Sequence, residues 1–131
     1  MKKTHNLYSL RYNQCNSSTK IGKFNLKTIS FGRLTRNQLE SIIRLTETFT
    51  KKIMSKKKFK LWNFLFLNLT LTKLSSESRM GKGKGAVYSD AIFLKPGTVL
   101  FEFNKISYQQ ISEIYQFISK KVPFKIKISK I

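Results

Sequence analysis

Apolar and polar residues alternate in two stretches of the chain, one near its beginning and one at its end. In residues 20–29, Phe24, Leu26 and Thr28 fall on one side of a period of two, and Lys23, Asn25 and Lys27 fall on the other. In the last stretch, residues 124–131, the alternation sets Phe124, Ile126, Ile128 and Ile131 against Lys125, Lys127 and Lys130. A period of two places one set of side chains in the core and the other in solvent. Both stretches are therefore predicted to be half-buried strands.

Two other stretches repeat apolar residues at spacings of three and four, the period of an amphipathic helix. Each opens with a capping box, Thr35 with Gln38 and Ser107 with Gln110. The predicted buried stripe of the first helix is Leu39, Ile42, Ile43, Thr46 and Phe49, and that of the second is Ile111, Ile114, Tyr115 and Ile118. Lysines and Pro123 are expected to end the second helix.

The middle of the chain is more apolar. Residues 61–71 predict a strand that is buried on much of both faces. Residues 87–94 and 98–103 predict a hairpin, because Pro96 and Gly97 between them occupy the two central positions of a type II turn.

Together these elements predict a single compact α+β domain, with an antiparallel or mixed sheet, two helices packed on it and a long loop rich in glycine and lysine. A chain of 131 residues is long enough for one buried core. Residues 1–19 lack sustained periodicity and are expected to be a divergent basic N-terminal extension. The α+β domain is placed at residues 20–131.

The net charge of the chain indicates the class of molecule that it binds. Twenty-six lysines and arginines face six acidic residues, a formal net charge of +20. Such an excess repels itself in a compact fold unless a polyanion neutralises it, so nucleic acid is the expected partner. The abundance of Lys, Asn, Ile and Phe is typical of an AT-rich coding sequence, as found in some organelle and parasite genomes. The basic extension is interpreted either as a weak transit peptide or as an RNA-binding tail.

Several function classes are excluded. One cysteine and one histidine provide neither a disulfide nor a set of Cys/His metal ligands. The apolar run at residues 61–71 is too short to span a bilayer. No close pair in the sequence is formed by the carboxylates, which are Glu40, Glu47, Glu77, Asp90, Glu102 and Glu113. We therefore expect no enzyme activity, no metal, no cofactor, no membrane span and no homo-oligomer.

Residues 79–85, here called the Gly/Lys loop, carry the strongest candidate chemistry. They are Arg79, Met80, Gly81, Lys82, Gly83, Lys84 and Gly85. Glycines allow the backbone to approach another molecule, and the cations lie beside exposed N–H groups, which is suited to phosphate. The spacing matches neither a Walker loop nor a dinucleotide-binding loop. The alternative is a flexible, solvated hairpin tip.

Two further basic groups are candidates for RNA contact. One surrounds the start of the first helix and consists of Arg33, Arg36 and Arg44. The other precedes Trp62 and includes Lys56, Lys57, Lys58 and Lys60. Such clusters either bind the phosphate backbone of a nucleic acid without recognising its base sequence, or are solvent-exposed surfaces with no binding role. Trp62 is either a core residue or a base-stacking platform, and the lysines of the last strand either follow RNA or protect a sheet edge.

The order of these motifs resembles the large-subunit ribosomal protein sixteen family of bacteria and organelles. The matching stretches are SRMGKGKG at residues 78–85, KPGTVLFE at 95–102, KKVP at 120–123, LTRNQLE at 34–40 and KLW at 60–62. They cover roughly residues 20–129 in order and at compatible spacing. The chain departs from the family in its first nineteen residues, which contain few glycines, and after Trp62, at Asn63 and at residues 68–70.

The resemblance implies a structural constituent of the large ribosomal subunit, embedded in ribosomal RNA near the central protuberance and joining late in assembly. It further implies that the Gly/Lys loop reaches towards the peptidyl-transferase region and the A-site tRNA, with the P-site tRNA and neighbouring large-subunit proteins as further partners. The expected location is the mitochondrial matrix, on the mitoribosome; the alternative is another organelle with an AT-rich genome. The alternative function is a non-ribosomal basic nucleic-acid-binding protein.

Overall fold

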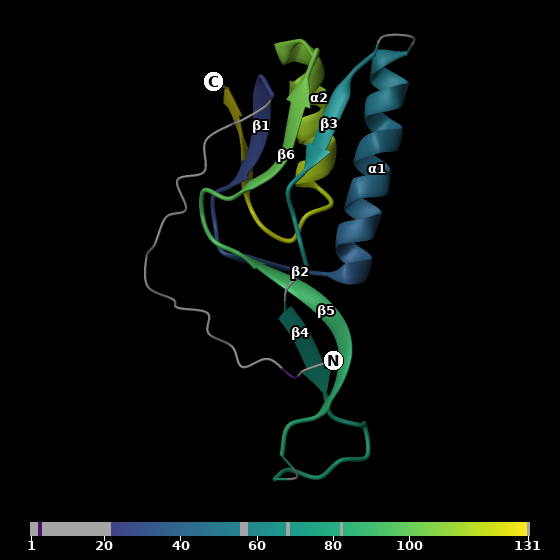
Figure 1. The fold of residues 1–131 in the computed structure, drawn as a ribbon, viewed down its shortest axis with the longest axis vertical. Helices are drawn as coiled ribbons and strands as arrows, with labels where there is room; N and C mark the ends of the chain where they lie inside the picture. Colours follow the sequence, from purple (N-terminus) through teal and green to yellow (C-terminus); the bar gives the residue numbers. More distant parts are fainter. Residues whose placement is uncertain (1–2, 4–21, 56–57, 68, 82, 131) are drawn as a thin grey trace.

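The computed structural model describes residue 3 and residues 22–55, 58–67, 69–81 and 83–130. These residues form two antiparallel sheets and two helices. The strands are β1 (Phe24–Thr28), β2 (Gly32–Thr35), β3 (Lys60–Asn63), β4 (Leu69–Lys73), β5 (Ala86–Leu94), β6 (Val99–Asn104) and β7 (Ile126–Lys130), and the helices are α1 (Arg36–Met54) and α2 (Tyr108–Ser119). The first sheet has the order β3-β6-β1-β7 and the second β2-β5-β4 (Figure 1). The predicted α+β class is confirmed, with two sheets in the described residues rather than one.

The core lies between the first sheet and the two helices. Register places Phe24 opposite Phe103, and Phe103 opposite Leu61, so these three side chains share one face of the sheet. They form one apolar cluster with residues of both helices, among them Leu39 and Ile114. The helices therefore cover this face, and burial of the cluster is the main source of stability.

The strand predicted at residues 20–29 is buried on both faces rather than one. β1 lies between β6 and β7, and Asn25, expected in solvent, is 0% exposed between Glu102 and Ser129 of the neighbouring strands. The period of two was correct, but it does not reveal that a strand is central. β7, by contrast, is an edge strand, and its two lysines, Lys127 and Lys130, are exposed, as is Lys125 just before it, as predicted.

Both predicted helices begin at their capping boxes. The Thr35 hydroxyl accepts from the Gln38 N–H, and the Gln38 side chain accepts from the Thr35 N–H; Ser107 and Gln110 make the same pair of bonds. The buried stripe of α2 is formed by Ile111, Ile114 and Ile118. The buried stripe of α1 is formed by Leu39, Ile42, Thr46, Thr50 and Met54, while Ile43 and Phe49 are half-buried against the core. The two buried threonine hydroxyls donate to carbonyls one turn earlier in α1.

The prediction of a single strand at residues 61–71 is wrong, because this segment contains parts of two strands, β3 and β4. β3 ends at Asn63, whose side-chain oxygen accepts the N–H of Leu65 at 3.0 Å and turns the chain. Leu65 is buried, whereas Phe66 is 77% exposed. The chain then enters β4, in the other sheet. Residue 68, part of the family departure noted above, lies outside the described residues.

The hairpin predicted across residues 87–103 is also wrong, although its turn is correct. Gly97 has φ +87°, and the Thr98 N–H donates to the Lys95 carbonyl at 3.2 Å, as a type II turn requires. However, β5 pairs with β2 and β4, while β6 pairs with β1 and β3. The turn is bonded to the end of β1 instead, because the Gly97 N–H donates to the Thr28 carbonyl at 2.8 Å. β2 itself was not predicted.

The boundary at residue 20 stays a prediction, because residues 1–2 and 4–21 lie outside the described part of the chain. Neither of the helices described is long and apolar enough to cross a membrane.

Candidate nucleic-acid interface

The Gly/Lys loop lies at the tip of the hairpin formed by β4 and β5, which pair as far as Lys73 and Ala86. The hairpin projects away from both helices, so that the loop is at one end of the long axis of the molecule (Figure 1). The predicted arrangement, a loop with a strand on each side, is confirmed.

Two of its glycines hold exposed backbone in conformations that other residues rarely adopt. Gly81 has φ +95° and Gly83 has φ +76°, and a side chain built on either would meet no atom within 4 Å. Met80 beside them is 100% exposed. The tip of the loop therefore presents bare backbone that another molecule can approach closely.

Gly85 has a different role. A Cβ atom at this position would lie 2.5 Å from the Lys73 carbonyl oxygen, much closer than van der Waals contact. The absence of a side chain lets the two backbone segments meet, which closes the loop at its base. The third glycine of the motif therefore maintains the shape of the loop.

Three cations gather along the described part of this loop. Arg79 and Lys84 are exposed, and the Lys3 ammonium group donates to the Lys84 carbonyl at 3.0 Å. Lys3 had not been predicted as a site residue, since its contact spans 81 positions of sequence. Lys82 lies outside the described residues. Cations beside open backbone can bind phosphate by charge and by hydrogen bonds.

The three predicted arginines do not share one environment. Arg33 on β2 and Arg44 on α1 are exposed. Arg36, the first residue of α1, is ion-paired with Asp90 of β5; its Nε donates to Oδ2 at 3.1 Å and its Nη2 donates to the same oxygen. These hydrogen bonds and the carboxylate charge raise the pKa of Arg36 above its ordinary value. Part of its hydrogen-bonding capacity is thus used inside the protein.

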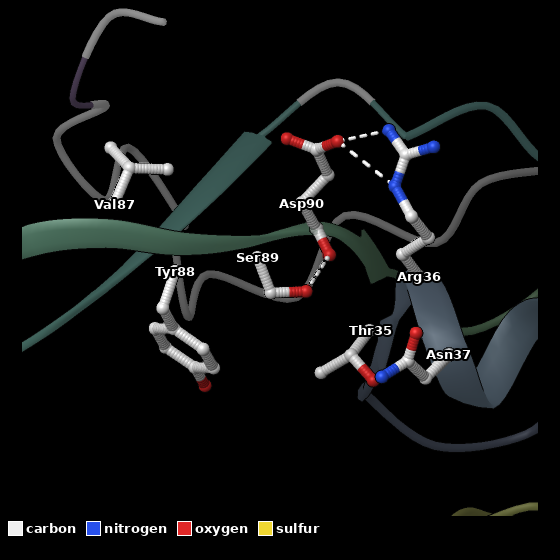
Figure 2. Close-up of a pocket in the computed structure, with 7 residues that line it drawn as sticks. All are labelled: Thr35, Arg36, Asn37, Val87, Tyr88, Ser89 and Asp90. Atoms are coloured by element: carbon white, nitrogen blue, oxygen red, sulfur yellow. Dashed lines mark hydrogen bonds and ion pairs between the residues drawn. The ribbon is translucent and has the colours of Figure 1, made fainter.

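Figure 2 shows the hollow around this ion pair, between the start of α1 and β5. Its other lining residues are Thr35, Asn37, Val87, Tyr88 and Ser89. The Ser89 hydroxyl donates to the carbonyl of Asp90 at 3.0 Å. None of the described residues that line this hollow is a histidine, cysteine or lysine.

The second predicted cluster is enlarged by the fold. Lys58 and Lys60 are exposed and line a pocket with Lys51, Ser55, Phe59 and Lys105; we call this the lysine pocket. Lys51 and Lys105 were missed as site residues. Lys105 is brought to the pocket by the pairing of Lys60 with Asn104, and the sequence alone does not reveal this pairing. Lys56 and Lys57 lie outside the described residues.

Trp62 is half-buried and lies opposite Glu102 in the register of β3 and β6. Since side chains alternate along a strand, it points to the face of the sheet opposite to Leu61 and the helices. It therefore does not fill the main core. The lysines of β7 lie on a sheet edge, which fits both of the roles considered for them.

Among the described residues, no three His, Cys, Asp or Glu side chains lie close enough together to hold a metal ion.

Comparison with known proteins gives consistent matches. Residues 1–129 match the family described as "Ribosomal protein L16p/L10e". The chain is 50% identical over 127 residues to "Large ribosomal subunit protein uL16m" of Chondrus crispus, covering 96% of this chain and 92% of that protein. It is 37% identical over 114 residues to uL16 of Psychrobacter arcticus (87% of this chain, 80% of the relative). It is 35% identical over 108 residues to uL16c of Emiliania huxleyi (82% and 75%).

Proposed function

The chain belongs to the ribosomal protein L16p/L10e family, and we propose that it binds the RNA of the large subunit of a mitochondrial ribosome and uses its Gly/Lys loop to help order the A-site tRNA. Membership makes the chain a structural protein of the large ribosomal subunit rather than an enzyme. We propose in addition that the protein contacts ribosomal RNA and tRNA directly and takes part in late assembly of the subunit.

The observation that carries the proposal is the geometry of the loop. It combines exposed backbone at Gly81 and Gly83 with the cations of Lys3, Arg79 and Lys84, at the tip of a hairpin that projects from the helical part of the fold (Figure 1). No carboxylate occurs in residues 79–85 to oppose an anion. These groups can contact phosphates and sugars of a folded RNA without performing chemistry.

The mitochondrial location is supported by a higher sequence identity to a relative named uL16m than to one named uL16c. The chain shares 50% identity with uL16m of Chondrus crispus and 35% with uL16c of Emiliania huxleyi. Its neighbours there are large-subunit ribosomal RNA and other proteins of the same subunit. The predicted contacts of Arg33, Arg36 and Arg44, and of residues 56–58 and 60, belong to the same RNA-binding role.

The triple alanine variant of Arg79, Lys82 and Lys84 tests the role of the loop. Because exposed loop side chains contribute little to stability, the variant is expected to fold and to enter ribosomes. A-site tRNA binding to purified ribosomes that carry it should be weakened. The charge-matched control is the triple alanine variant of Lys52, Lys120 and Lys121, which are exposed and lie outside the loop. Normal tRNA binding by the loop variant, or an equal loss in the control, would refute the proposed role.

A further inference from the structure

The lysine pocket lies at the opposite end of the molecule from the Gly/Lys loop. It is formed where α1 ends and β3 begins, at the far end of the long axis in Figure 1. Four of its lining residues are lysines, namely Lys51, Lys58, Lys60 and Lys105, and none of the described residues that line it is acidic. RNA bound at the Gly/Lys loop would therefore not neutralise the positive charge of the lysine pocket.

Three separate elements bring these lysines together. Lys51 lies in the last turn of α1, where the N–H of the following Ser55 donates to its carbonyl at 3.1 Å. Lys60 opens β3 and pairs with Asn104, the last residue of β6, so that Lys105 follows directly beside it. The half-buried Phe59 packs against the core and fixes the segment that carries Lys58 and Lys60. The pocket is thus a product of the fold rather than of a run of lysines alone.

The backbone of the pocket is unusual. Ser55 (φ +53°) and Lys105 (φ +63°) are the non-glycine residues with positive φ in the described part of the chain, and both line this pocket. Glycine or asparagine would adopt this conformation more readily than lysine. The Lys105 N–H is held by the side-chain oxygen of Asn104 at 2.9 Å. Non-glycine residues at positive φ cluster at functional sites, and here two of them line one pocket.

Like charges that converge without an acidic partner repel one another. The carbonyl groups at the end of α1 favour nearby cations, but this effect falls off within the last turn and does not account for four lysines. A phosphate that enters the pocket would neutralise the repulsion, and lysine binds phosphate as a point charge.

We propose that the lysine pocket binds a backbone phosphate of large-subunit ribosomal RNA, with Lys51 and Lys105 as ligands alongside Lys58 and Lys60. The proposal rests on the proposed function in one respect, the identity of the RNA. Since the pocket and the Gly/Lys loop lie at opposite ends of the fold, they hold separate positions on the RNA. The pocket anchors the protein, while the loop is left to contact tRNA.

The first test is lysine acylation, followed residue by residue by mass spectrometry. In intact large subunits the pocket lysines should react more slowly than in the free protein, and ribonuclease digestion should restore their reactivity. Protection of the pocket lysines that persists in the subunit after ribonuclease digestion would assign the pocket to a partner other than RNA and overturn the RNA assignment. Unchanged reactivity in the intact subunit would overturn the proposal altogether.

The second test measures the salt dependence of binding to large-subunit rRNA transcribed in vitro. K51Q/K105Q is compared with K52Q/K120Q, which removes the same charge from exposed positions outside the pocket. Loss of one phosphate contact should reduce the slope of log K against log salt by about 0.7–0.9 in the pocket variant. The control should keep its slope, and K51R/K105R should regain it. Equal changes in both glutamine variants, or no change in either, would overturn the pocket.

The two proposals can fail separately. If K51Q/K105Q binds rRNA normally while the loop variant loses A-site tRNA binding, only the pocket is wrong. If the unmodified protein shows no preference for large-subunit RNA, the proposed function fails, and the pocket assignment fails with it.

Discussion

Arg36, the first residue of α1, is ion-paired with Asp90 on β5, and this contact links the helical layer to the hairpin that carries the Gly/Lys loop. The two residues are 54 positions apart in sequence. β2 leads directly into α1 and pairs with β5, with Thr35 opposite Ala91, so the ion pair continues a backbone connection between the same elements. Arg36 therefore has an internal structural role, whatever RNA it also touches.

Removal of this ion pair should loosen the hairpin more than it lowers global stability. The Arg36 side chain is 51% exposed, and exposed ion pairs contribute little to folding. In Arg36→Gln or Asp90→Asn, we expect faster hydrogen exchange of β4 and β5 amides with an almost unchanged Tm. The charge-swapped variant R36D/D90R should recover part of the protection. Unchanged exchange in the single variants would contradict this role.

The pH dependence of the contribution from Arg36 follows from the direction of its pKa shift. A raised folded-state pKa means that the stabilisation is fully present below the unfolded-state pKa, which for arginine lies far above neutral pH, and is lost only as pH rises through the folded-state pKa. We expect hydrogen exchange in the hairpin, corrected for its intrinsic pH dependence, to show no titration of Arg36 between pH 6 and pH 9. A transition in that range that is absent from Arg36→Gln would contradict this assignment.

The glycines of the loop should respond differently to alanine. A Cβ at Gly85 would collide with the Lys73 carbonyl, so Gly85→Ala should lower the free energy of unfolding by about 1–3 kcal/mol. Gly83→Ala has open space but an unfavourable positive φ. Since the exposed tip can change conformation locally, its effect on global unfolding should be smaller. Urea denaturation compares the two variants, and equal losses would contradict the separate roles of these glycines.

Glu102 should contribute through a buried hydrogen bond. Its side chain is 2% exposed, and its Oε2 accepts the Gly22 N–H at 3.0 Å. Glu102→Ala removes the acceptor and is expected to cost about 1–3 kcal/mol. Glu102→Gln keeps an oxygen at the same position and should cost less. Thermal unfolding of the two variants measures this difference, and equal destabilisation would show that the hydrogen bond to Gly22 is unimportant.

The capping box of α2 provides a local test of the fold. The Ser107 hydroxyl accepts the Gln110 N–H at 3.3 Å. Ser107→Ala should destabilise the protein by about 1 kcal/mol, whereas Ser107→Gly should cost only about a few tenths, because glycine is itself tolerated at the N-cap. Chemical denaturation of both variants checks this order, which a purely solvated Ser107 would not produce.

Local features of this fold could be predicted because their partners are close in sequence. Thr35 lies three residues from Gln38, and the turn at Pro96 and Gly97 depends on four consecutive residues. Strand partners depend on distant segments instead. The turn gave no indication that β5 and β6 belong to different sheets, and the apolar run after Lys60 concealed the change of sheet between β3 and β4.

The same reasoning explains which site residues were found. The Gly/Lys loop is contiguous, so its composition and glycine spacing were visible in the sequence. Lys3 and Lys105 reach their places through contacts with Lys84 and the β3–β6 pair, which no local pattern encodes. The ion pair of Arg36 was likewise invisible, because Asp90 lies in a strand whose partner, β2, was not predicted.

Sedimentation tests the central claim most directly. The tagged protein from mitochondria of its own organism is run on a sucrose gradient in high salt with magnesium retained. We predict that it remains with the large subunit and with the complete ribosome, because a protein built into folded RNA resists salt that screens simple charge attraction. Recovery of the protein at the top of the gradient, with intact large subunits below it, would contradict its role as a structural component of that subunit.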